Sequence, residues 1–293
     1  IINGIANWSK ENTRLDITAH LKDFCPNAIH LTDKYPNLTL DASANISLST
    51  YGKHWIDNLT GHIIIDSLNV QNGSKQAIME QMKLLVDNDI KNKKKHHRLQ
   101  LQSDFVTANI SGIFQYTTLL NTAQRIIHGY VPSLVTAPKK INRQPNELSF
   151  YAYFRQLETI SEVLDLEVSL PHYPTIKGYI DEQKEALELQ AYIPNINTDG
   201  TNIKDLTIAL NNPNEALDLS VYMYNCLPQN NPTAAKIGDV KAHINVKAQD
   251  DKIGLQISLD NTDSVRNAGI INISSKIARY ADKPLFDIHV HPS

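Results

Sequence analysis

The segment LTLDASANISL, residues 38–48, alternates an apolar residue with a polar one along its whole length. Side chains of a strand point alternately to its two faces, so this segment makes a strand with one apolar and one polar face. The same alternation recurs in the runs Leu187–Ile193, Leu206–Leu210, Leu217–Met223, Ala242–Ala248 and Ile253–Leu259. The sequence therefore predicts a mainly β protein whose antiparallel strands share one apolar face.

Residues 13–70 predict further strands, with loops near Cys25-Pro26-Asn27 and Tyr35-Pro36. Residues 75–87 fit either a helix or a strand, and we favour a strand because the neighbouring segments are strands. Two segments break this rhythm. Residues 116–131 and 157–164 carry apolar side chains at helical spacing and predict two short amphipathic helices. We expect the first helix to cap the open end of the sheet or to cover its apolar face.

The best candidate boundary inside the chain is residues 132–145, which contain Lys, Pro and Asn. This composition predicts a linker between a first β segment, residues 1–131, and a second one, residues 146–293. The chain begins without Met and ends as a strand is forming, so we expect it to be cut from a longer polypeptide.

The composition excludes wholesale disorder, with 41% hydrophobic and 20% charged residues. A net charge of -3 gives no overall attraction to nucleic acid, so we expect no nucleic-acid partner. The basic run KNKKKHHR, residues 91–98, could bind phosphate, but it has no aromatic residues for base stacking. We expect it to be a solvated hairpin tip that protects a sheet edge. Cys25 and Cys226 could pair in a disulfide, although we expect unpaired buried thiols.

The string DIHVHP, residues 287–292, looks the most like a catalytic motif. Two His residues separated by one residue on a strand lie on one side, as in metal-dependent amidohydrolases. Those enzymes carry the motif on the first strand of an alternating β/α fold, which nothing upstream of residue 287 predicts. We therefore expect His289 and His291 on the solvated face of a strand, with no metal and no cofactor. The sequence also has no nucleophile-elbow or phosphate-loop motif, so we predict no catalytic residue and no enzyme activity.

Several longer strings carry a resemblance to a known family. They are LTGHIIIDSL (59–68), LQSDFVTANISGIFQY (101–116), YVPSL (130–134), IKGYID (176–181), AYIP (191–194) and NIKDL (202–206). In these strings the chain resembles the TamB family, the translocation and assembly module component of the AsmA-like superfamily, in its Bacteroidetes form. The resemblance covers essentially all 293 residues.

The resemblance implies an elongated antiparallel sheet curved into a U-shaped, taco-like groove that spans the periplasm of a Gram-negative bacterium. It implies an inner-membrane anchor and a contact with an Omp85-type outer-membrane barrel, both through regions outside this chain. Related groove proteins carry phospholipid between membranes, and the family is also implicated in outer-membrane assembly. We therefore expect a non-enzymatic segment of a lipid-transport protein.

The apolar positions of the late runs would suit acyl chains, because each buried methylene contributes about 0.8 kcal/mol. The same residues could instead pack against one another as a sandwich core. Other functions are a scaffold or chaperone that adds outer-membrane β-strands to its sheet edge during insertion or secretion, and an adhesive surface protein. The residues that we expect to line a lipid groove are Leu187, Leu189, Ile193, Leu206, Ile208, Leu217, Leu219, Val221, Ile253, Leu255, Ile257 and Leu259.

Overall fold

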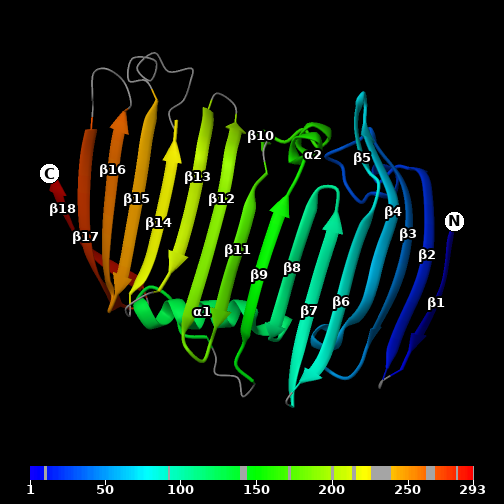
Figure 1. The fold of residues 1–293 in the computed structure, drawn as a ribbon, viewed down its shortest axis with the longest axis horizontal. Coiled ribbons are helices and arrows are strands. Elements are labelled where there is room, and N and C mark those ends of the chain that lie inside the picture. Colours follow the sequence, from blue (N-terminus) through cyan, green and yellow to red (C-terminus); the bar gives the residue numbers. More distant parts are fainter. Residues whose placement is uncertain are drawn as a thin grey trace. The chain divides into compact units, whose positions relative to one another are not determined.

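The computed structural model describes residues 1–9, 12–91, 93–138, 144–170, 173–198, 201–212, 216–225, 239–261, 268–281 and 283–292. Their strands belong to one large antiparallel sheet that does not close on itself, which confirms the mainly β expectation (Figure 1). The curvature of this sheet into a U-shaped groove stays a prediction. The chain divides into two compact units. Unit 1 comprises residues 1–117 and 150–173, and unit 2 comprises residues 118–149 and 174–293.

Unit 1 is built from strands that pair antiparallel with the next strand along the chain. β4 is long enough to pair with both β5 and β6. The ambiguous residues 75–87 are therefore strands, as predicted. The bounds are β1 (Ile2–Trp8), β2 (Thr13–Phe24), β3 (Leu38–Thr50), β4 (Thr60–Asn72), β5 (Lys75–Met79), β6 (Met82–Lys91), β7 (Lys94–Ser103) and β8 (Val106–Ile113).

Short helical segments connect these strands. The loops between β2 and β3 and between β3 and β4 contain the single turns η1 (Asn27–Ile29) and η2 (Ile56–Asn58). The chain returns to unit 1 through β9 (Glu147–Phe154), followed by α2 (Leu157–Val163) and β10 (Val168–Ser169). Left-handed residues flank α2, Gln156 with φ 49° and Asp165 with φ 48°. The helix predicted at residues 157–164 is confirmed.

Two side chains of the β4–β5 hairpin hold α2 on unit 1. The Asn72 side-chain amide donates to the Val163 carbonyl at 2.8 Å and to the Asp165 carboxylate at 3.2 Å. The Lys75 ammonium forms an ion pair with Asp165, and this hydrogen bond lowers the pKa of that carboxyl. Val163 is only 2% exposed, so the helix buries its last turn against the sheet.

Unit 2 begins at the end of η3 (Tyr116–Thr118), which leads into α1 (Leu119–Tyr130). The helix predicted at residues 116–131 is thus confirmed. The eight strands that follow β10 pair antiparallel in sequence order. They are β11 (Thr175–Asp181), β12 (Ala186–Thr198), β13 (Thr201–Asn211), β14 (Leu217–Tyr224), β15 (Val240–Gln249), β16 (Lys252–Asn261), β17 (Ala268–Tyr280) and β18 (Lys283–Pro292).

A buried polar network fixes α1 to the β11–β12 turn. The Glu182 carboxylate accepts hydrogen bonds from Thr122 Oγ1 at 3.1 Å and from the Asn146 backbone N–H at 3.0 Å, and it forms an ion pair with Arg125. The Asn146 side chain is fully buried and donates to Thr118 and Thr122 at 3.2 and 2.7 Å. These hydrogen bonds satisfy the buried polar side chains at the N-terminal end of α1.

The basic run and Cys25 differ from the expectations. β6 ends at Lys91 and β7 begins at Lys94, so residues 94–98 of the basic run belong to a strand rather than to a hairpin tip. His97 within that run is 2% exposed, because the alternation of side chains along β7 places it on the same face of the sheet as Leu99. Cys25 is half-buried rather than buried and is a free thiol. Cys226 lies outside the described residues, as does the part of the predicted linker at residues 139–143.

Candidate apolar binding face

The apolar residues of unit 2 meet across the sheet in continuous rows. The strand register places Leu189, Leu210, Leu219, Val246, Leu255, Ile273 and Val290 side by side on seven successive strands. A second row contains Ala191, Ile208, Val221, Ile244, Ile257 and Ile271. Because each row lies two residues from the next, all of them project from the same face.

All twelve residues predicted as groove lining lie on this one face. Leu189, Leu219 and Leu255 belong to the first row, and Ile208, Val221 and Ile257 to the second. The flanking rows hold the others: Leu217 beside Ala248 and Ile253, Ile193 beside Leu206, Leu259 beside Ala242, and Leu187 beside Ile180. Leu187 is buried and Leu259 is 44% exposed, whereas the other ten are half-buried.

One end of this face is covered by α1 and the turn that follows it. Val131 packs with Ala248 and Ile277 in a small buried cluster, which Ile127 and Leu217 join. The helix therefore covers part of the apolar face, as predicted, although Leu120 points away from the sheet and is 86% exposed. Toward the middle of the strands, the described part of unit 2 contains no second sheet, and its main strand contacts are between hydrogen-bonded neighbours. Among the described residues of unit 2, the sandwich-core alternative therefore has no second sheet to form it.

Unit 1 presents an equivalent face with two hollows in it. One row contains Leu15, Leu48, Gly61, Val86, Leu99 and Ile110 on six paired strands. The first hollow, here called the indole hollow, measures about 480 Å³ and is lined by Trp8, Thr13, Leu15, Leu48, Ser49, Thr50, Trp55 and Leu59. The second, the α2 hollow, measures about 290 Å³ and is lined by Ile65, Leu68, Val70, Ala77, Met79, Met82, Ser103, Phe105, Val106, Ile160, Val163 and Leu164.

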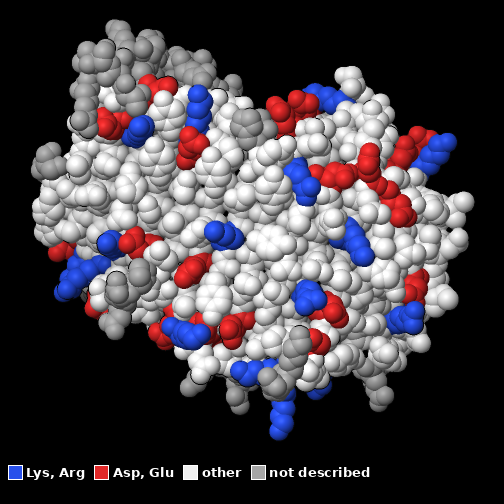
Figure 2. Space-filling model, in the orientation of Figure 1, with Lys and Arg blue, Asp and Glu red and all other residues white. Residues whose placement is uncertain are grey.

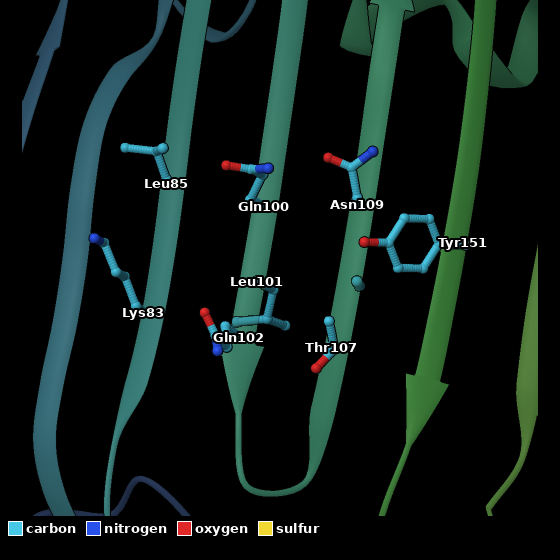
Figure 3. Close-up of a pocket in the computed structure, with 9 residues that line it drawn as sticks. Lys83, Leu85, Gln100, Leu101, Gln102, Thr107, Asn109 and Tyr151 are labelled. Carbon is cyan, nitrogen blue, oxygen red and sulfur yellow. The ribbon is translucent and has the colours of Figure 1, made fainter.

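Charged residues of both signs are mixed on the face of the molecule shown in Figure 2. Figure 2 shows Lys and Arg interspersed with Asp and Glu on the visible face rather than gathered into a patch of one sign. A shallow hollow of about 210 Å³ lies where Gln100 and Asn109 face Tyr151 from β9 (Figure 3). The ionisable groups of its lining are Lys83 and Tyr151.

The two histidines of the HxH string lie on exposed positions of β18. Their rings are stacked with centroids 6.5 Å apart, and His289 Nε2 is 3.3 Å from the Asp287 carboxylate. His291 Nε2 lies 3.3 Å from Ser274 Oγ. Within the described ranges no three His, Cys, Asp or Glu residues gather as metal ligands. His289 and His291 are thus on the solvated face of β18, as expected from the alternation.

His97 lies in a buried aromatic environment on β7. Its ring lies 5.1 Å from the Phe114 ring and 5.4 Å from the Tyr116 ring. Burial, assisted by the charge of Lys95, lowers the pKa of His97 to about 4, although the Asp57 charge opposes the shift. Burial also raises the pKa of Tyr116 to about 12. Both groups are therefore neutral near pH 7.

Comparison with known proteins gives no identification. No protein-family model matches the sequence, and no curated protein or solved structure is significantly similar to it. Membership of the TamB family therefore stays a prediction. No helix in the described residues is long and apolar enough to cross a membrane.

The sequence analysis missed the two hollows of unit 1. It identified the alternation at residues 38–48, yet placed the binding residues only in the late runs. A signal was available: the chain's two tryptophans are Trp8 and Trp55, one on either side of the first long strands. The sequence did not show that both would line one hollow, since that depends on the β1–β2–β3 register.

Proposed function

We propose that the apolar face is a binding surface for phospholipid acyl chains, in a non-enzymatic segment of a cell-envelope protein that transports phospholipid between the inner and outer membranes. The observation that supports this proposal most is the set of aligned, half-buried aliphatic rows in unit 2, over whose middle the described residues of that unit place no second sheet. Soluble proteins rarely expose large contiguous apolar patches unless these bind something.

The chemistry of the rows supports a lipid tail rather than a polar ligand. The first two rows of unit 2 contain aliphatic side chains on every described strand from β12 to β17. Adjacent strands lie about 4.8 Å apart, so equivalent apolar positions repeat at short intervals across the sheet. Because these positions are similar, none of them should bind an acyl chain much more tightly than the next, so the chain could move from one to another. The TamB-like strings support the proposed location in a Gram-negative periplasm, with anchor and Omp85-type contact outside this chain.

The test is lipid retention by a face variant. We expect Leu255→Asp to reduce the phospholipid that copurifies with the protein, measured by mass spectrometry, because the new carboxylate would lose its hydration beside a bound tail. Gln256→Asp is the matched control: it adds the same charge to the next residue of β16, on the polar face. Circular dichroism should show both variants folded. If Leu255→Asp unfolds, or retains as much lipid as the control variant, the proposal is wrong.

A second candidate function is strand addition to outer-membrane proteins, which β1 favours. This strand pairs with β2 along all seven of its residues and is exposed at each of them. It contains no charged residue and no proline, the usual features that protect an exposed strand. Crosslinks from Ile5 to an unfolded outer-membrane protein would support this function, and Ile5→Lys should abolish them.

A further inference from the structure

The indole hollow of unit 1 has the composition of a boundary between polar and apolar surroundings. Both tryptophans of the chain line it, although Trp8 is 77% and Trp55 is 56% exposed. Indole rings combine a large apolar surface with one N–H donor, and they gather where lipid tails meet headgroups. Two such exposed rings at one apolar hollow indicate a ligand that is polar at one end.

The strand register shows which end of the face is polar. Trp8 pairs with Thr13, and Thr13 pairs with Thr50, so one row combines an indole with two hydroxyl side chains. The next row along the same face is Ala6, Leu15 and Leu48, and the row after it contains Ile17, Ile46 and Ile63. The face therefore changes from hydroxyl and indole groups to purely aliphatic side chains within one step.

The loop beside the hollow adds positive charge at the same end. Lys53 is exposed two residues before Trp55. Asp57 in the same loop is 4% exposed, and its carboxylate accepts hydrogen bonds from Thr117 Oγ1 at 2.9 Å and from the Thr117 backbone N–H. The exposed charge of this loop is thus that of Lys53, which complements a phosphate.

The distance to the second hollow matches a lipid tail. On β3, Leu48 of the indole hollow is four residues from Ala44, whose partner Ile65 lines the α2 hollow. Four residues of strand span about 13 Å. One leaflet of a bilayer accommodates an acyl chain within about 15 Å. A tail that starts at the indole hollow therefore reaches the hollow under α2, whose lining is apolar except for Ser103.

We propose that unit 1 binds a phospholipid in one direction, with its phosphate headgroup at Trp8 and Trp55 and the methyl end of its tail under α2. This inference rests on the proposed function and adds a site and an orientation to it. Ile160, Val163 and Leu164 of α2 would contact the methyl end, while Thr13 and Thr50 lie near the headgroup.

Tryptophan fluorescence tests the orientation, because both indoles lie at the site. The probe is a phosphatidylcholine vesicle whose lipid carries bromine either next to the headgroup or near the methyl end of its acyl chain. Bromine quenches only nearby indoles, so we expect the lipid brominated near the headgroup to quench the protein more strongly. Equal quenching, the reverse order, or no quenching by a lipid that the protein retains would overturn the orientation.

Two variants serve as controls. Trp8→Phe/Trp55→Phe/Tyr151→Trp moves the indole to the polar-face hollow beside Gln100 and Asn109, where both brominated lipids should quench weakly (Figure 3). Trp8→Ala/Trp55→Ala should bind phosphatidylcholine about tenfold more weakly, since the aromatic contacts are lost. Mass spectrometry of retained lipid separates the two proposals. If no lipid is retained, both proposals fail; if lipid is retained and Trp8→Ala/Trp55→Ala binds it as tightly as the wild type, the further inference alone fails.

Discussion

At the scale of single residues, His97 shows how a strand buries a titratable group at the edge of a basic segment. Its ring is 2% exposed beside Phe114 and Tyr116, and Nδ1 has no hydrogen-bond partner in the structure. Lys95 of the same strand instead donates to the Asp57 carbonyl at 2.9 Å and lies over the Tyr51 ring. The neutral imidazole thus packs as an aromatic side chain.

The lowered pKa of His97 makes stability depend on pH. The pKa is about 4 in the folded protein and near 6.5 when unfolded, so the unfolded chain binds the proton first as pH falls. The free energy of unfolding should therefore decrease from pH 6.5 to 4, by up to about 3 kcal/mol for this group. Asp57, Lys95, His96 and Tyr116 are the charged or titratable groups around it.

Urea titrations at a series of pH values measure this dependence. His97→Phe keeps the ring packing and removes the titration, so this variant should lose less stability between pH 6.5 and 4 than the wild type. His96→Phe is the control at the neighbouring position, because His96 lies on the other side of β7. Identical pH profiles for His97→Phe and the wild type would contradict a buried neutral imidazole.

At the scale of elements, Glu182 joins α1 to the β11–β12 turn through a buried set of polar contacts. The carboxylate is the acceptor for Thr122, Arg125 and the Asn146 backbone, and the Glu182 side chain is only 7% exposed. Glu182→Ala should reduce the free energy of unfolding by about 3 kcal/mol, because it leaves buried donors without this acceptor. Gln183→Ala changes an exposed side chain of the same turn and should cost little. Thermal unfolding measures both, and equal effects would refute the assignment.

The helices and strands were more predictable than the contacts between them. The helices α1 and α2 were predictable from apolar residues spaced three or four positions apart. The strands β12 to β16 were predictable from the alternation of apolar and polar residues. The Glu182–Thr122 bond joins residues 60 positions apart, which no local pattern indicates. His97 was missed for a related reason: the positive charges around it predict a solvated tip, whereas the period of the strand turns this one ring inward.

At the scale of the molecule, the predicted binding residues lie on one face of the sheet because neighbouring strands pair apolar residues with apolar residues. Each strand from β13 to β16 contributes apolar residues at every second position, so pairing aligns them into rows once neighbours are in register. The sequence could not reveal whether a second layer covers those rows. It also could not reveal the indole hollow, which joins Trp8, Leu15 and Trp55 from separate segments.

The measurement that tests the lipid-binding face most directly is site-specific photocrosslinking to phospholipid. A photoreactive benzoylphenylalanine would replace Leu219 or Leu255 on the apolar face, and Ser220 or Gln256 at the neighbouring positions on the polar face. The purified protein would be incubated with phospholipid vesicles, irradiated and analysed by mass spectrometry. The account predicts lipid adducts at Leu219 and Leu255, with few at Ser220 and Gln256. Equal adducts at all four positions, or none at the two leucines, would contradict it.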